Sequence, residues 1–216
     1  QDAFTAEEIR TPTDANRRIS FPYTKMMNAN MAVDMGAAII LCSVEKAREL
    51  RIPEEKWVYP LAGVQGYDHF SASVRDNFHS SPGLGLVGKR VMELAKVSPE
   101  EVDYVDLYSC FPSAVQIAAR ELGFSEERQL TVTGGLTFGG GPLNNYVMHA
   151  VARTVELLRK APGKKAFVSA NGGNLYKHVH CVYSSQAPEE PYQYENIQQE
   201  IDALPSRICL PEYDGK

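Results

Sequence analysis

The chain has 216 residues, 44% of them hydrophobic, which is enough for one large domain or two small ones with a sizeable buried core. Its 27 acidic and 22 basic residues give a net charge of -5, without the basic excess or long like-charge run that nucleic-acid and anionic-membrane binders usually carry. No apolar run approaches the roughly 20 residues that a membrane-spanning helix needs. We therefore expect a soluble protein that has neither nucleic acid nor a membrane as a partner.

The cysteines are few and scattered along the chain. The four are Cys42, Cys110, Cys181 and Cys209, with no C-x-x-C pair and no cysteine-histidine cluster of zinc-site spacing. A chain of this size with an ordinary core needs no disulfides, so free thiols in a reducing compartment are expected. These features predict a cytoplasmic protein without a metal site.

The first fifty-five residues differ in pattern from the rest of the chain. Residues 1–30 carry turn and cap residues without periodicity, which predicts an irregular segment. Ala37–Cys42 is an apolar run typical of a buried strand, and Ser43–Leu50 begins with a capping pattern and predicts a short helix. A second strand is predicted over Val58–Ala62, before a long polar loop.

The middle of the chain alternates between helix and strand signals. Ser81-Pro82 opens a helix whose apolar face extends to Leu94, and a second capping box at Ser98–Glu101 precedes a strand over Val102–Leu107. Pro112 then begins a helix that is predicted to end at Leu122.

The last third of the predicted core contains a glycine-rich loop. A short strand over Leu130–Thr133 leads into the loop at Gly134–Pro142, and a long amphipathic helix runs through Val147–Leu158. Strands are predicted over Ala166–Ala170 and Val179–Tyr183, and these two strands could add an antiparallel edge. The alternation predicts a layered α/β fold with a largely parallel sheet, whereas residues 186–216 resemble a linker or arm.

Four segments together resemble the thiolase superfamily, and specifically its sterol-carrier-type, thiolase-like branch often described as acetyl-CoA acetyltransferase. Asn30–Ser43 (NMAVDMGAAIILCS) is similar to the family's DGAAA strand, and Val105–Phe111 (VDLYSCF) to its HDCF or NEAF segment. Gly134–Pro142 (GGLTFGGGP) resembles the GG…GHP loop, and Ala170–Gly173 (ANGG) more weakly the CxGG loop. The resemblance covers roughly residues 20–185.

This resemblance implies a particular architecture and set of partners. Family members have two similar α/β halves, so residues 56–185 would form the C-terminal half with a mostly parallel five-stranded sheet, and residues 1–55 would be a remnant of the N-terminal half with its last strand. The rest of that half would lie upstream or on a partner subunit. A homo- or hetero-oligomer is implied, with a small OB-fold protein as a further possible partner. Coenzyme A thioester would be the substrate, with no bound cofactor.

The matching loops depart from the family pattern at three positions. Gly141 stands where the family has its catalytic histidine, and Ala170 stands where it has its second catalytic cysteine. Tyr108 replaces the residue that helps to hold a water molecule or thioester oxygen. Condensation or thiolysis by the usual residues is therefore put in question.

Four side chains remain as catalytic candidates. Tyr108 and Cys110 precede the Pro112 helix, whose positive dipole end would favour a phenolate or thiolate. His178 comes after the Ala170–Gly173 loop and could supply a base, although His180 would share its face of a strand. His149, one turn into the long helix, could face the same pocket with the neighbouring asparagines. For each, a structural role in packing, capping or a solvated strand end is the alternative.

The ligand-binding candidates are backbone groups and one amide side chain. Glycines allow backbone amides to approach a thioester oxygen closely. The candidates are Gly139, Gly140, Gly141, Asn171 and Gly172.

Three functions fit these residues. An acyltransferase of the thiolase type is the leading hypothesis, with the rest of the site upstream or on a partner chain. A retro-aldolase acting on a 3-hydroxyacyl-CoA needs a tyrosine or histidine base and no cysteine nucleophile. A non-catalytic CoA-binding or scaffolding subunit is the third.

Overall fold

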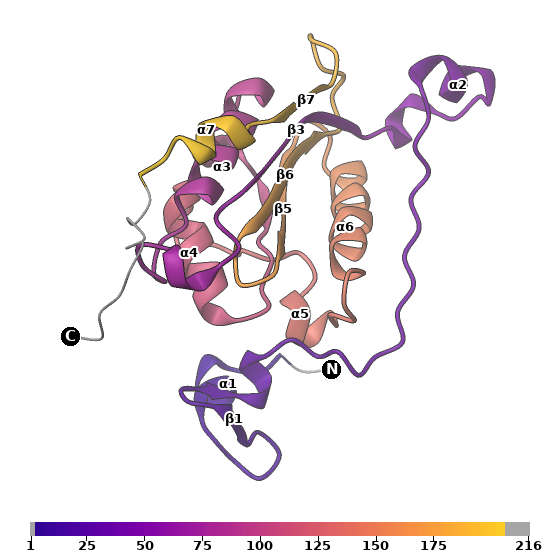
Figure 1. Ribbon diagram of the computed structural model, residues 1–216. Helices are drawn as coiled ribbons and strands as arrows, with labels where there is room; N and C mark the ends of the chain where they lie inside the picture. Colours follow the sequence, from indigo (N-terminus) through magenta and orange to yellow (C-terminus); the bar gives the residue numbers. More distant parts are fainter. Residues whose placement is uncertain (1–2, 206–216) are drawn as a thin grey trace.

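The computed structural model describes residues 3–205, which form a five-stranded sheet between helices (Figure 1). The strand order is β4-β5-β6-β3-β7, and only β6 runs against the other four. The strands are β3 (Tyr59–Tyr67), β4 (Tyr104–Asp106), β5 (Lys165–Gly172), β6 (Lys177–Ser184) and β7 (Gln193–Asn196). The expectation of a mostly parallel, five-stranded α/β sheet is confirmed.

Helices cover both faces of this sheet (Figure 1). On one face lie α3 (Pro82–Ala95), α4 (Pro112–Leu122) and the short α7 (Gln198–Asp202), and on the other lies α6 (Tyr146–Lys160). The single turn α5 (Gly135–Phe138) lies within the glycine-rich loop. The expected helices after Ser81 and Pro112 and after the glycine loop are therefore confirmed.

Local sequence explains where these helices begin and end. Both α3 and α4 start with proline, whose missing N–H costs nothing in the first turn of a helix. Gly123 ends α4 with a φ of 74°, a conformation that glycine adopts without a steric penalty. Ser98 and Glu101 form the predicted capping box, here around a 3₁₀ turn (Pro99–Glu101).

The core is divided by the sheet into two layers. The larger layer packs Val87 and Val91 of α3 against Phe167 and Val182 of the sheet, all of them inaccessible to solvent. The smaller layer lies under α6 and includes Tyr146. Burying side chains of this size contributes about 1.5–3 kcal/mol each, so the sheet and its helices are held mainly by apolar burial.

The predicted strand over Leu130–Thr133 is wrong, because this segment is hydrogen-bonded largely to side chains. The Leu130 carbonyl accepts one bond from the Leu107 amide, but the Val132 amide donates to the Asp106 carboxylate at 2.9 Å. The fifth strand is instead β7, within the range expected to be a linker or arm. It pairs in parallel with β3, and Ile201 of α7 packs into the core.

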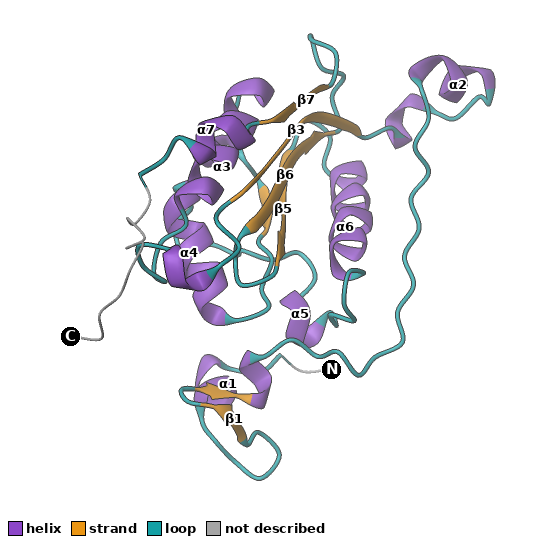
Figure 2. Cartoon of the chain, viewed as in Figure 1, coloured by secondary structure: helices purple, strands orange, loops and turns teal. Residues whose placement is uncertain are grey.

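Residues 31–43 form an extended segment that lacks a neighbouring strand (Figure 2). The prediction of a buried strand at Ala37–Cys42 is wrong, because no other segment within residues 3–205 supplies the hydrogen bonds of a sheet. Alternate side chains nevertheless point inward, with Ile39 packed against the α6 layer and Ile40 91% exposed. The segment therefore has the side-chain pattern of a strand without its partners.

The first thirty residues are not irregular throughout, contrary to expectation. They contain α1 (Ala6–Arg10), the hairpin of β1 (Arg18–Ser20) and β2 (Tyr23–Thr24), and a 3₁₀ turn (Lys25–Met27). Asn16 organises them, because its buried side-chain amide donates to three carbonyls in and after α1. Further along the chain, Ser43 caps the expected short helix α2 (Val44–Glu49), and 3₁₀ turns occur at Glu54–Lys56 and Ala72–Val74.

Three of the four cysteines lie within the described residues, and each of those three is a free thiol. Cys209 lies outside the described residues. Across residues 3–205, no helix is long and apolar enough to cross a membrane.

Candidate functional site

A pocket of about 330 Å³ opens beside the start of α4. Its walls are the loop at residues 72–78, the first turns of α4, and the turn at residues 173–175 between β5 and β6. The lining residues are Ala72, Arg75, Phe78, Cys110, Phe111, Ser113, Ala114, Ile117, Asn171, Gly173, Asn174 and Leu175. Two predicted site residues, Cys110 and Asn171, thus meet in one pocket.

Cys110 supplies the thiol among the lining residues of this pocket. Its Sγ lies 3.9 Å from Nδ2 of Asn171, which donates a long hydrogen bond to the sulfur. Burial raises the pKa of the Cys110 thiol, and the nearby Phe111 amide only partly offsets this. The expectation that the helix terminus lowers this pKa is therefore wrong, because the loss of solvent outweighs the dipole. A thiol with a raised pKa is largely protonated at neutral pH, so little thiolate is present.

Asn171 also has an unused polar atom. Its Oδ1 is buried and has no hydrogen-bond partner among the described residues. A buried amide oxygen without a donor costs free energy, so a ligand N–H or O–H in the pocket would find a ready acceptor. The neighbouring candidate, Gly172, pairs with Lys177 in the ladder between β5 and β6 and does not line the pocket.

Tyr108 lies near Cys110 but is directed elsewhere. Its ring packs edge-on against that of Tyr146, with 5.6 Å between centroids, and its amide donates to Ser169. Burial, and then the neighbouring Cys110, raise the pKa of Tyr108, so the predicted favouring of its phenolate is wrong. Tyr108 belongs to the layer under α6 and does not line the pocket.

A buried polar network ties the end of β4 to α6 and the glycine loop. Asp106 is inaccessible to solvent, and its carboxylate accepts hydrogen bonds from Tyr146 at 2.8 Å and Thr131 at 3.0 Å. Burial raises the pKa of Asp106 despite these bonds, and burial together with the Asp106 charge raises the pKa of Tyr146. The network fixes the segment that carries Tyr108 and Cys110.

The glycine-rich loop holds the N-terminal segment in place. The Gly141 amide donates to Asn30 at 2.9 Å, and the Gly139 amide donates to Gly135 at 2.7 Å. Of the three predicted loop amides, only that of Gly140 makes no hydrogen bond within the described part of the chain. A Cβ at position 141 would lie 2.9 Å from Leu136, so a side chain there would require Leu136 to shift.

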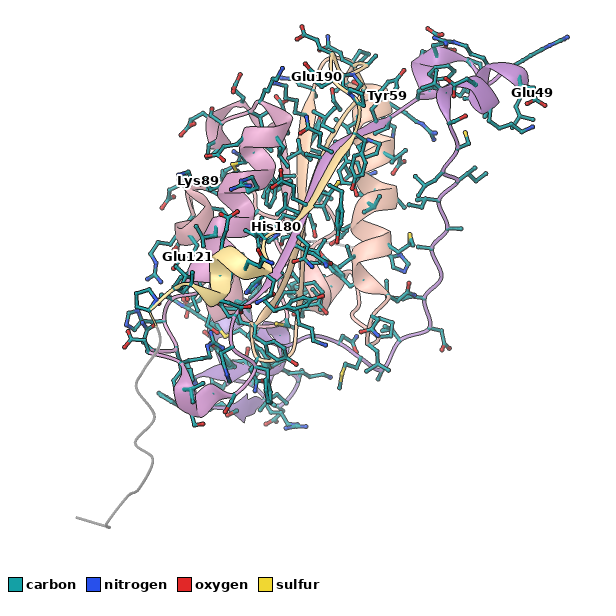
Figure 3. All side chains as sticks on the ribbon, turned by 45° about the horizontal axis from the view of Figure 1, so that its top comes forward. Glu49, Tyr59, Lys89, Glu121, His180 and Glu190 are labelled. Carbon is teal, nitrogen blue, oxygen red and sulfur yellow. The ribbon has the colours of Figure 1, made fainter. Side chains whose placement is uncertain are left out.

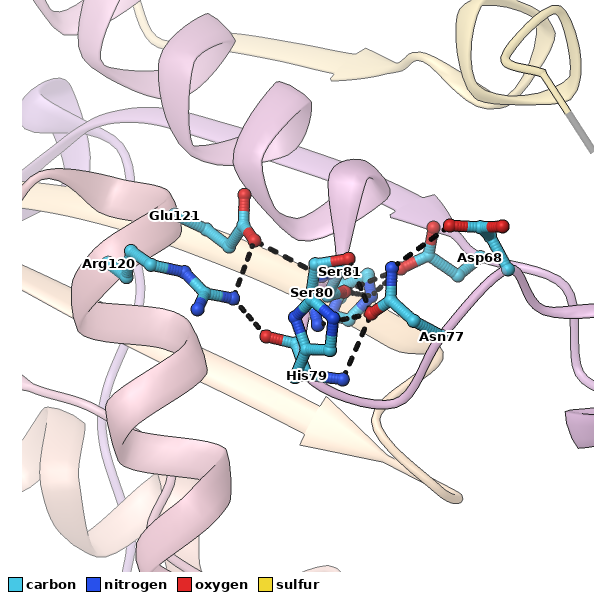
Figure 4. Close-up of polar contacts among 9 residues, drawn as sticks. Asp68, Asn77, His79, Ser80, Ser81, Arg120 and Glu121 are labelled. Carbon is cyan, nitrogen blue, oxygen red and sulfur yellow. Dashed lines mark hydrogen bonds and ion pairs between the residues drawn. The ribbon is translucent and has the colours of Figure 1, made fainter.

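His178 lies in a different polar cluster, with Asp68 and with Ser81 at the start of α3, both of which Figure 4 labels. Its Nε2 is 3.0 Å from Asp68 and 3.2 Å from Ser81, and the Ser81 hydroxyl donates to the same Asp68 carboxylate. Burial alone would raise the pKa of Asp68, but the bonds from His178, Ser81 and the Gly83 amide lower it overall. His178 is fully buried and does not line the pocket, so the structure does not bring it together with Cys110.

Two further histidines, His180 and His149, have buried ring nitrogens without hydrogen-bond partners among the described residues. His180 does share the inner face of β6 with His178, as predicted, and it lies between the sheet and the helices (Figure 3). Burial, and then the charge of His178, lower the pKa of His180 to about 3, and neither ring nitrogen has a partner among the described residues. His149 on α6 has a buried Nε2 that is likewise unpaired in the described region, and it does not line the pocket.

Two structural features of this region could not be predicted from the sequence. Arg75 lies in the polar loop, where its sequence neighbourhood has no motif, and only the fold brings it against the turn at residues 173–175. The Asp106–Tyr146 bond joins residues forty positions apart and has no local signal.

A structure titled as a monomeric SCP2-thiolase-like protein type 1, from Mycobacterium smegmatis, is 37% identical to this chain with a TM-score of 0.83. The match covers 93% of this chain and 44% of that one. The chain belongs to the thiolase superfamily. This confirms the resemblance drawn from the four sequence segments, and it places the chain near the SCP2-thiolase-like branch.

Two curated proteins that match this chain have lower sequence identity to it than the Mycobacterium smegmatis structure has. Acetyl-CoA acetyltransferase 1 of Arabidopsis thaliana is 29% identical over 147 residues, covering 68% of this chain and 33% of that protein. A 17-hydroxy-3-oxo-4-pregnene-20-carboxyl-CoA lyase of Mycobacterium tuberculosis is 25% identical over 151 residues, covering 66% of this chain and 38% of that protein. A scan against models of known protein families finds no match. The chain spans 26–43% of the length of the curated relatives it matches.

Proposed function

We propose that this chain is the C-terminal, acyl-CoA-handling half of a thiolase-like enzyme that makes or breaks a carbon–carbon bond. The observation that carries the proposal is the position of Cys110, whose thiol lies in the pocket beside Asn171 at the start of α4. The names of the relatives support coenzyme A thioesters as the substrate class.

In this proposal Cys110 moves a proton. Cleavage of a β-oxoacyl or β-hydroxyacyl thioester leaves the electron pair of the broken bond on the α-carbon, and that carbon must receive a proton. A thiol whose pKa is raised by burial is protonated at neutral pH and can supply it. In the reverse direction the thiolate would accept a proton from the same carbon.

The acyltransferase reaction needs a nucleophile to take the acyl group. Position 170 carries alanine and position 141 glycine, so we propose that the nucleophile is supplied by the N-terminal half of the fold, on the same polypeptide or a partner subunit. The extended segment at residues 31–43 supports such a partner, because its inward side chains alternate as in a strand while Ile40 and Leu41 are exposed. We expect that half to place strands beside it.

A lyase is the second candidate, and the similarity to the Mycobacterium tuberculosis CoA lyase favours it. Retro-aldol cleavage needs a base for the 3-hydroxyl group and a proton donor for the α-carbon, but no acyl-enzyme. Cys110 serves the second role in both reactions. Transfer of a radiolabelled acyl group onto a protein cysteine would identify the acyltransferase, and release of a free aldehyde or ketone would identify the lyase.

The test uses the protein assembled with its N-terminal half, whose presence is established by native mass spectrometry. Binding of coenzyme A and acetyl-CoA is measured by calorimetry, and turnover is measured with 3-oxoacyl and 3-hydroxyacyl thioesters. We expect Cys110→Ala to lower turnover by about 10²–10⁴-fold while the dissociation constant for CoA changes little. Cys181→Ala is the matched control, because Cys181 is also a free and partly buried thiol but does not line the pocket.

Two results would count against these assignments. Equal turnover by the Cys110 and Cys181 variants would remove Cys110 from the chemistry. Absence of CoA binding in the assembled protein would contradict the acyl-CoA-handling function itself.

A further inference from the structure

The charged lining of the pocket beside Cys110 is positive. Of its twelve lining residues only Arg75 is charged, and none is an aspartate or glutamate. The amides of the first turn of the eleven-residue helix α4 add a partial positive charge at the same wall. The pocket therefore favours an anionic group in its ligand.

Arg75 is held in place by two contacts within residues 3–205. Its Nη1 donates to the Asn174 carbonyl at 2.5 Å, and its guanidinium lies 5.9 Å from the centroid of the Phe78 ring. Within residues 3–205, no carboxylate lies within 4.0 Å of this guanidinium. Its partners in the described part of the chain are thus a carbonyl and a ring, which orient its fork of N–H donors without an ion pair there.

The pocket that Arg75 and Cys110 both line is suited to a short carbon chain. Apolar side chains from three segments line it, namely Phe78, Ile117 and Leu175. At the Cys110 end, the unpaired Oδ1 of Asn171 offers an acceptor to a polar ligand group. A ligand that combines a polar reacting end, a short apolar chain and an anionic group matches this set of lining groups.

We propose that Arg75 is a specificity-determining residue that pairs with a carboxylate at the far end of the acyl chain. The substrate class of this site is then the coenzyme A monothioesters of dicarboxylic acids. This inference rests on the proposed function, because it assumes that the thioester lies near Cys110. A phosphate of coenzyme A is the other anion available, but the whole pantetheine arm separates the CoA phosphates from the thioester, whereas Arg75 and Cys110 line the same pocket.

The experiment compares glutaryl-CoA with pentanoyl-CoA, which have acyl chains of equal length and differ in the terminal carboxylate. Dissociation constants for both esters and for free CoA are measured by calorimetry on the assembled protein, for the unmodified chain and for Arg75→Gln and Arg75→Lys. A charged, hydrogen-bonded pair predicts that glutaryl-CoA binds about 10-fold or more tightly than pentanoyl-CoA. Arg75→Gln should abolish this preference, and Arg75→Lys should retain part of it.

Arg159→Gln is the matched control, because Arg159 also donates to a backbone carbonyl, that of Lys56, and does not line the pocket. It should leave the preference unchanged, and thermal unfolding should show that every variant is folded. Equal binding of the two esters would overturn the proposal while leaving the acyl-CoA function intact. Equal weakening of both esters and of free CoA by Arg75→Gln would also overturn it, by assigning Arg75 to the CoA phosphates. Failure of every CoA compound to bind would instead contradict the proposed function.

Discussion

His180 gives the fold a specific sensitivity to acid. The side chain is 1% exposed, and both ring nitrogens are buried without partners among the described residues. Its pKa is lowered from 6.5 to about 3, so the unfolded chain binds a proton between these pH values and the folded chain does not. Stability is therefore lost as the pH falls below 6.5.

The size of this loss is set by the pKa difference. Between pH 7.5 and pH 5.0, the protonation of His180 in the unfolded chain lowers the free energy of unfolding by about 2 kcal/mol. His180→Leu has a side chain of similar volume, removes this dependence, and also removes the cost of two unpaired buried nitrogens, about 1–3 kcal/mol. The variant should thus be more stable at pH 7.5, with a larger advantage at pH 5.0.

Urea unfolding at the two pH values measures the effect. His79→Gln is the control, because it removes an exposed histidine and so separates the loss of any histidine from the loss of the buried one. If the unmodified protein and His180→Leu lose the same stability between pH 7.5 and 5.0, the account of His180 as a buried neutral histidine is wrong.

Three other predictions concern packing, the polar network and the thiols. Gly88→Ala should lower the free energy of unfolding by about 1–3 kcal/mol, because its Cβ would overlap the Leu122 side chain where α3 meets α4. Gly85→Ala should instead be neutral or stabilising, because the atom nearest to its Cβ would be 3.3 Å away on the flexible Glu121 side chain. Similar losses of stability for the two variants in urea titrations would refute this reasoning. Tyr146→Phe should cost about 1–3 kcal/mol in the same titrations, because Asp106 and Thr133 lose a buried partner, and an unchanged midpoint would contradict this. Iodoacetamide at pH 7.5 should modify the exposed Cys42 before Cys110, because burial raises the pKa of the Cys110 thiol. Earlier labelling of Cys110 in a mass-spectrometric time course would show that its thiol is more reactive than the geometry indicates.

Much of the fold can be predicted from local patterns. Proline and glycine mark both ends of α4, and the capping box at Ser98 is formed as predicted. The strands β5 and β6 agree with prediction because their apolar runs are long and bounded by turn residues. Such signals lie within a few residues of one another and do not depend on distant partners.

The elements that sequence patterns miss depend on partners that the local sequence does not reveal. The edge strand β7 has few apolar residues, and it is ordered by its pairing with β3, over one hundred residues earlier. Ala37–Cys42 has the sequence pattern of a strand. Within residues 3–205 no strand lies beside it, so the segment is extended but is not part of a sheet. The extent of burial around Cys110 also has no local signal, and it reverses the expected direction of the thiol pKa shift.

The central claim is that the pocket beside Cys110 binds the acyl end of a coenzyme A thioester. Hydrogen–deuterium exchange of the assembled protein, with and without saturating acetyl-CoA, tests it most directly. The account predicts slower exchange in residues 72–78, at the start of α4 and in residues 171–175, with no change in the loop at residues 186–191 on another part of the sheet. Unchanged exchange around the pocket, or protection confined to residues 186–191, would contradict it.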